Sequence, residues 1–235
     1  MRLWRALLAS FSYFSILPSK AFGERADGDA IALLPIVGLV IGGLAGWGAY
    51  GAYALTHSAA AAAIVAWVLS IALSGAIHID GFLDCCDGLF AMASPERRLE
   101  IMRDPHHGTY AVAGMAMLSA VWLYALLQIA PGALPVTLAM AAGFGRLSGA
   151  GVAAPRNPLT LVSIVAIVLT FAWYFRGHEM GFAVAAVLAS LAGFVVQAFA
   201  RHRLGGKLNG DCYGAIVAVT ELVLLLTIPY AAPLP

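Results

Sequence analysis

The sequence predicts an all-α, polytopic integral membrane helical bundle, on three observations. Of its 235 residues, 62% are hydrophobic and only 11% are charged, whereas soluble domains average roughly 45–50% and about 25%. Seven apolar stretches approach or exceed the roughly 20 residues that a helix needs to cross a bilayer. The basic residues gather in alternate connections between these stretches, as in other polytopic membrane proteins. A water-soluble domain is therefore a poor description of this chain.

Residues 1–20 are expected to form an interfacial helix that lies along the membrane surface. Arg2 and Arg5 precede a largely apolar run that ends near Pro18, a pattern typical of such helices. A signal peptide is the alternative, but serines interrupt the run and no small-x-small cleavage site follows it.

The predicted spans must be helices, because an open sheet would leave backbone groups unpaired in the hydrocarbon. Counts of six or eight stay open, since Arg146 falls inside the fourth segment and the fifth segment is short. No repeat or linker divides the chain, so we expect one domain over 1–235. The seven segments are 31–55, 58–78, 110–130, 133–154, 158–175, 181–200 and 213–231.

The distribution of lysine and arginine predicts a cytoplasmic N-terminus and an external C-terminus. The connections on the opposite side hold only Arg176. The formal net charge is +1, so total charge gives no reason to expect a nucleic acid partner. The basic residues assigned to the cytoplasmic side are Arg2, Arg5, Lys20, Arg25, Arg97, Arg98, Arg103, Arg156, Arg201, Arg203 and Lys207.

Small residues predict one close helix contact in the first span. Gly38, Gly42 and Gly46 recur every four residues, a spacing that lets a second helix approach closely.

The long polar connection 79–109 holds six of the twelve acidic residues and is the expected cytoplasmic catalytic segment. Asp80, Asp84 and Asp87 fall within a wedge of roughly 60° on a helix. Three like charges on one face repel one another unless a cation neutralises them, and oxygen ligands favour a hard ion such as Mg²⁺. A solvated acidic helix end is the alternative.

A zinc site is a weaker interpretation of the same connection. Cys85 and Cys86 point about 100° apart on a helix, so we expect them, like Cys212, to be free thiols and the first two to pack between helices. His106 and His107 follow a proline and are expected to be loop residues.

Three further features are expected on the same membrane face. Arg103, downstream of a short helix that starts at Pro95, could bind phosphate, or could belong to a charge ladder with Glu100. Arg146 lies inside an apolar segment, where an unpaired charge is costly, and could pair with Glu221. The connection 203–215 offers glycines for close approach, a cation and oxygen ligands, although a plain turn would have the same composition. Its residues of interest are Gly205, Gly206, Lys207, Asn209, Gly210 and Asp211.

Over nearly its whole length the sequence resembles the cobalamin synthase family, the adenosylcobinamide-GDP ribazoletransferases of the cytoplasmic membrane. The segments that carry the resemblance are LLPIVGLVIGG, GAIHIDGFLDCCDGLF, RRLEIMRDPHHGTY and LGGKLNGDCYGA, together with Arg146 and Glu221. The family's glycine-rich loop is usually nearer to G-G-x-T-G-D, so Lys207 is a departure.

The resemblance implies an Mg²⁺-dependent transferase of the inner membrane that joins adenosylcobinamide-GDP to α-ribazole or its 5′-phosphate, with release of GMP. It implies catalytic roles for Asp80, Asp84, Asp87, Asp104 and Asp211, with all but Asp104 as metal ligands. The substrate-binding residues it implies are His78, Arg103, Arg146, Gly206, Lys207 and Asn209. Whether the enzyme is a homo-oligomer stays open.

Two other classes of membrane protein share parts of this pattern. A CDP-alcohol phosphotransferase shares D-x-x-D-G from Asp84 to Gly88, but Met92 replaces the arginine that such enzymes require. A membrane transporter would use Arg146, Glu221 and the aspartates as substrate or ion sites, yet the sequence shows no inverted repeat.

Overall fold

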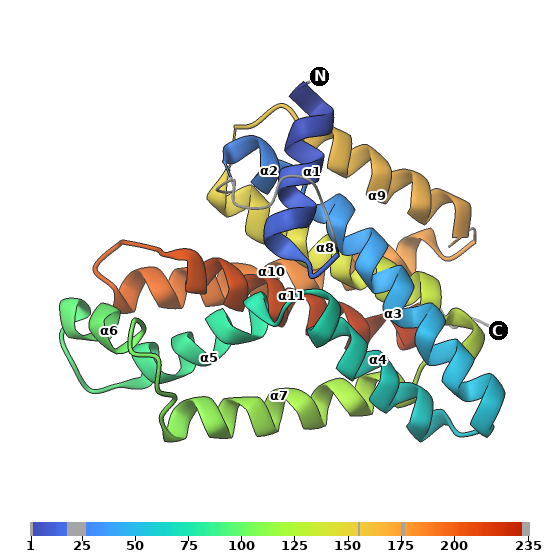
Figure 1. Cartoon of the computed structure of the whole chain (residues 1–235), viewed down its shortest axis with the longest axis horizontal. Coiled ribbons are helices and arrows are strands. Elements are labelled where there is room, and N and C mark those ends of the chain that lie inside the picture. The colour runs from blue at the N-terminus through green and yellow to red at the C-terminus, as the bar shows by residue number, and fades with distance from the viewer. Residues whose placement is uncertain (1, 18–26, 155, 175–176, 232–235) are drawn as a thin grey trace.

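The computed structural model describes residues 2–17, 27–154, 156–174 and 177–231, and every regular element in these ranges is a helix (Figure 1). Pro18, Lys20, Arg25 and Arg176, which entered the predictions above, lie outside the described residues. The elements are α1 (Arg2–Phe14), α2 (Gly28–Ala32), α3 (Leu34–Thr56), α4 (Ala59–Leu73), α5 (Ile77–Phe90), α6 (Pro95–Ile101), α7 (Thr109–Leu127), the 3-10 turn η1 (Pro131–Ala133), α8 (Leu134–Ala153), α9 (Thr160–Tyr174), α10 (Glu179–Arg203) and α11 (Gly210–Ala231).

Five helical segments in the described residues are long and apolar enough to cross a membrane: α3, α7, η1 with α8, α10 and α11. The α4–α5 pair passes the same criteria only as a bent unit, with an angle of 89° between its helices, which gives up to six spans. The fifth predicted span, 158–175, corresponds to α9, which is apolar but only 15 residues long, or roughly 22 Å against about 30 Å of hydrocarbon. The polytopic helical fold is confirmed, and by length and composition the described residues hold five or six candidate spans, where seven were expected and six was left open.

The break between α4 and α5 is the main departure from the predicted helices. The segment 58–78 was expected to be one continuous helix, but α4 ends at Leu73 and the backbone is left-handed at Gly75 (φ 62°) and Ala76 (φ 59°). The amides of these two residues donate to the last carbonyls of α4, at Ala72 and Ile71, and so close the helix. A left-handed alanine costs roughly 1–2 kcal/mol, which the surrounding packing has to offset. Asp80, Asp84 and Asp87 consequently lie on a second helix, α5, that turns away from α4.

Helix α8 packs against α3 and α11 and forms the centre of the bundle. A side chain added at Gly38, Gly42 or Gly46 of α3 would collide with the backbone of α8, so the predicted close contact is confirmed. On the outside, α10 exposes apolar side chains such as Phe194 (62%) and Val195 (64%). An exposed apolar face of this extent matches a lipid environment.

Helix α1 has its apolar and polar side chains on opposite faces, as expected for a helix at the membrane surface. Just beyond it, the amide of Ile16 donates to the carbonyl of Leu73 over 3.0 Å. The N-terminal segment is thereby attached to the α4–α5 break.

Candidate active site at the crossing of α5 and α11

Two glycines bring α5 and α11 into backbone contact beside the acidic residues. A β-carbon on Gly81 would lie 2.9 Å from the Cα and carbonyl oxygen of Asp211, and one on Gly214 would lie 3.3 Å from the carbonyl oxygen of His78. Larger residues would push the helices apart. The 203–215 connection therefore meets the aspartate-bearing helix, as expected from the charge distribution.

Asp80, Asp84, Asp87 and Asp211 form a carboxylate cluster, and Asp84 interacts with each of the other three. Its side chain is only 15% exposed, and it interacts electrostatically with Asp80, Asp87 and Asp211, which are like charges. The ring of His107 lies between two of these carboxylates, with Nδ1 3.7 Å from Asp84 Oδ1 and Nε2 3.9 Å from Asp80 Oδ1. These separations exceed hydrogen-bond length, so His107 is a neighbouring charge partner only when it is protonated. His107 lies in the loop before α7, as the sequence predicts, but its position between the two carboxylates has no signal in the sequence.

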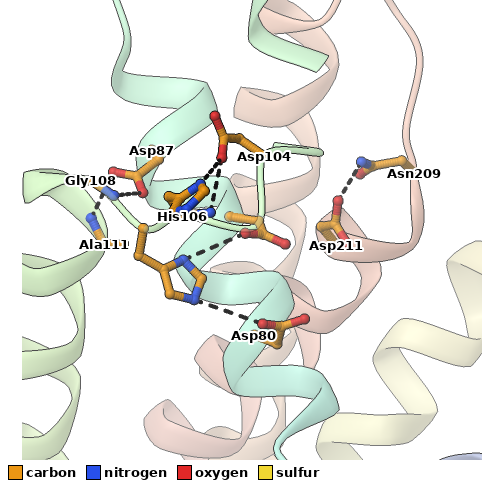
Figure 2. A network of polar contacts seen from close by, with 10 residues as sticks. Asp80, Asp87, Asp104, His106, Gly108, Ala111, Asn209 and Asp211 are labelled. Atoms are coloured by element: carbon orange, nitrogen blue, oxygen red, sulfur yellow. Dashed lines mark hydrogen bonds and ion pairs between the residues drawn. The ribbon is translucent and has the colours of Figure 1, made fainter. Parts of the chain in front are cut away.

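Asp87 is turned toward the start of α7 (Figure 2). Its Oδ2 accepts a hydrogen bond from the amide of Gly108 (2.6 Å) and its Oδ1 one from the amide of Ala111 (3.0 Å). The carboxylate thus satisfies amides at a helix N-terminus, where negative charge is favoured. Asp87 therefore has a structural role as a cap of α7. Its role as a metal ligand stays a prediction from its spacing.

Asp104 and Arg103 lie beyond the end of α6. Asp104 Oδ1 accepts the backbone amide of His106 (2.9 Å) and lies 2.8 Å from His106 Nδ1 (Figure 2). These hydrogen bonds hold the pKa of the Asp104 carboxyl below its usual range. Arg103 interacts electrostatically with Asp211, so the predicted phosphate-binding cation lies at the edge of the cluster.

The glycine-rich connection ends in a hydrogen-bonded turn at the start of α11. Asn209 Nδ2 donates to Asp211 Oδ2 over 2.7 Å (Figure 2), and Asn209 Oδ1 accepts the amide of Cys212 over 3.1 Å. Gly206 has a left-handed backbone (φ 88°), which explains a glycine there. Lys207 is exposed and interacts with Glu96 of α6. Asn209 therefore orients Asp211, while Lys207 remains accessible to a ligand.

Arg146 is buried in the bundle, away from the exposed edge of the cluster. Its side chain is 3% exposed, and its Nη1 lies 3.3 Å from Glu221 Oε2, which confirms the expected pair. A small cavity of about 30 Å³ adjoins this pair, and His78 Nε2, Arg146 Nε and Ser70 Oγ lie in this region without a protein hydrogen-bond partner. A cavity of that size and polarity suits an ordered water. Of the predicted substrate-binding residues, Arg146 and His78 are thus interior groups.

Two arginines that were used only to predict topology bind the C-terminal end of α5. Arg98 donates from Nη1 to the carbonyls of Leu89 (2.6 Å) and Gly88 (3.2 Å), and from Nε to that of Ala93. Arg203 donates from Nε to the carbonyl of Leu89 (2.8 Å) and from Nη2 to that of Ala91. Positive charge is favoured at a helix C-terminus, so both residues fix the helix that carries the aspartates.

The donor set fits a hard cation, although a complete metal site is not preformed. Among the described residues, no three His, Cys, Asp or Glu side chains converge closely enough to hold a metal ion. Mg²⁺ is commonly held by one or two carboxylates together with water and substrate phosphates. One or two carboxylates from Asp80, Asp84 and Asp211 would meet that requirement.

Comparisons with known proteins agree over almost the whole chain. A family model described as cobalamin-5-phosphate synthase matches residues 6–229. The adenosylcobinamide-GDP ribazoletransferase of Deinococcus radiodurans is 34% identical over 94% of this chain and 84% of its own length. The proteins of the same name from Bradyrhizobium diazoefficiens (33% identical, 92% of this chain and 89% of theirs) and Brevibacillus brevis (29%, 95% and 97%) are also similar. No solved structure matches the chain. The chain belongs to the cobalamin-5-phosphate synthase family.

Proposed function

We propose that this protein is an adenosylcobinamide-GDP ribazoletransferase. It would join adenosylcobinamide-GDP to α-ribazole, or to α-ribazole 5′-phosphate, and release GMP. Family membership and the names of the similar proteins support this proposal. The observation that carries it is the meeting of Asp80 and Asp84 on α5 with Asp211 on α11, with Arg103 at the edge of the cluster.

The reaction requires charge to be stabilised at a pyrophosphate. A ribose hydroxyl attacks the phosphorus nearer to cobinamide, and the bond from that phosphorus to the bridging oxygen of the departing GMP breaks. The hydroxyl loses its proton, and negative charge grows on the bridging oxygen. Arg103 and Lys207 are the accessible cations that would bind the phosphate oxygens.

Mg²⁺ is the proposed cofactor, and Asp80, Asp84 and Asp211 are its proposed ligands. When bound, it would neutralise the carboxylates and the pyrophosphate and stabilise the charge that develops during transfer. Asp87 is a further proposed ligand, because each carboxylate oxygen keeps a lone pair beyond the hydrogen bond it accepts from α7. Asp104 and Asp211 are the proposed candidates for the group that accepts the proton of the attacking hydroxyl.

We also propose that this site faces the cytoplasm from the inner membrane. Helix α6 and the α10–α11 connection lie at the same end of the molecule (Figure 1). This end carries Arg97, Arg98, Arg103, Arg203 and Lys207, and short basic connections favour the cytoplasmic side.

The test is GMP release by purified protein in lipid with adenosylcobinamide-GDP, α-ribazole and Mg²⁺. The variant Asp84→Asn removes one charge from a carboxylate that is only 15% exposed, and we expect activity to fall by a factor of 100 or more. Glu100→Gln is the matched control, because Glu100 pairs only with Arg97 on the exposed face of α6 (2.7 Å). Full activity in Asp84→Asn would remove it from the site, and substrate accumulation in vesicles without GMP release would support a transporter instead.

A further inference from the structure

A pocket of about 320 Å³ opens directly beside Asp80 and Asp211. Its walls come from α1, α2, α3, α5, α8 and α11, so it is assembled from parts of the chain far apart in sequence. Apart from the two carboxylates, the surface is mainly apolar and aromatic. Its apolar and aromatic lining includes Tyr13, Phe14, Ile77, Ala153, Tyr213 and Val217.

The pocket is suited to a flat ring. Phe14 lies nearly parallel to His78, with 15° between the ring planes and 6.3 Å between their centroids. Gly149 and Gly214 also line the pocket, where they present backbone in place of side chains. Aromatic rings pack favourably on parallel ring faces, and a mostly apolar pocket with a few polar groups at one side is typical of small-molecule sites.

We propose that this pocket binds the benzimidazole ring of α-ribazole, an inference that rests on the proposed function. The corrin ring is far too large for 320 Å³. Guanine carries several hydrogen-bonding groups on its edge, and burying them without partners is costly. Asp80 and Asp211 are needed at the pyrophosphate, and the other lining side chains that can hydrogen-bond are His78, Tyr13 and Tyr213. A benzimidazole ring is planar, bicyclic and mostly apolar.

The position of the pocket also fits the direction of the reaction. The same Asp80 and Asp211 that border the pocket belong to the carboxylate cluster. A base seated among Phe14, Ile77 and Val217 would leave its attached ribose at this border. The attacking hydroxyl would then lie next to the pyrophosphate, which is the positioning that transfer requires.

The test narrows the pocket with Ala153→Leu, at the partly buried C-terminal end of α8. We compare the α-ribosides of 5,6-dimethylbenzimidazole and of unsubstituted benzimidazole. The expected result is a rise of roughly tenfold or more in KM for the dimethylated riboside, a smaller rise for the other, and an unchanged KM for adenosylcobinamide-GDP. Ala59→Leu is the matched control, because Ala59 lines a separate pocket with Leu127 and Ile228.

The outcomes separate this inference from the proposed function. If the wild type releases no GMP with either riboside, the proposed function itself fails. If the wild type is active but Ala153→Leu raises only the KM for adenosylcobinamide-GDP, or raises neither KM, the benzimidazole assignment is wrong. A second test measures the affinity of wild type and of Phe14→Ala for α-ribazole by equilibrium dialysis, without turnover. Phe14→Ala removes the ring that lies against His78 and should weaken binding. An unchanged affinity would also overturn the benzimidazole assignment.

Discussion

Arg146 forms a buried pair with Glu221, and variants of this pair can show whether Arg146 has a structural role or a substrate-binding role. Arg146→Met would leave Glu221, whose side chain is 10% exposed, without the cation 3.3 Å away. Removing one partner of a buried ion pair typically costs about 3–5 kcal/mol. Replacing both partners, in Arg146→Met with Glu221→Leu, leaves no uncompensated charge and is often neutral or stabilising. We therefore expect the double variant to recover most of the stability that the single variant loses.

The assay measures unfolding and GMP release on the same preparations of wild type, both single variants and the double variant. Because Arg146 is 3% exposed and donates to Glu221 and to the carbonyl of Ala142, we expect activity to return with stability. A double variant that is as stable as wild type but inactive would refute this reasoning. It would show that Arg146 contacts substrate, as the family resemblance implied.

Two further predictions concern the C-terminal part of α5. Asp87→Ala removes the acceptor of the Gly108 and Ala111 amides and should lower the free energy of unfolding by about 1–2 kcal/mol. Asp87→Asn keeps one acceptor oxygen and should lower the free energy of unfolding by less. A stable Asp87→Asn variant with no activity would instead favour a role for Asp87 as a metal ligand. Arg98→Leu removes three hydrogen bonds to carbonyls at the end of α5 and should cost about 2–3 kcal/mol, measured by thermal unfolding against the exposed control Arg97→Leu.

The sequence predicted the parts of this fold that depend on composition and spacing. Apolar length located the helices, and the glycines at 38, 42 and 46 located the contact between α3 and α8. The Arg146–Glu221 pair was also expected, because a charge inside an apolar segment needs a partner. These features follow from local pattern and from the cost of burying polar groups.

The features that were missed depend on tertiary contacts. Gly75 is a local signal for the end of α4 at Leu73. Alanine is the strongest helix former, so nothing local predicts the left-handed backbone of Ala76. Asp87 has the helical spacing of a ligand, and only the position of α7 shows that its carboxylate caps another helix. Arg98 and Arg203 indicated a membrane side by their charge, but their hydrogen bonds to α5 depend on how α6 and α10 pack.

Helix α5 has to hold mutually repelling carboxylates, and the structure fixes it at three places. Its N-terminal end follows the closed turn at Ala76, which is attached to α1 through the Ile16–Leu73 hydrogen bond. Its middle contacts α11 at Gly81, and its C-terminal carbonyls are bound by Arg98 and Arg203. Repulsion among the carboxylates could be relieved by moving the helix, and these contacts oppose that movement. With the helix held in place, the repulsion is relieved by protonating a carboxylate or by binding positive charge, and the second is the property that a site for a metal-bound pyrophosphate requires.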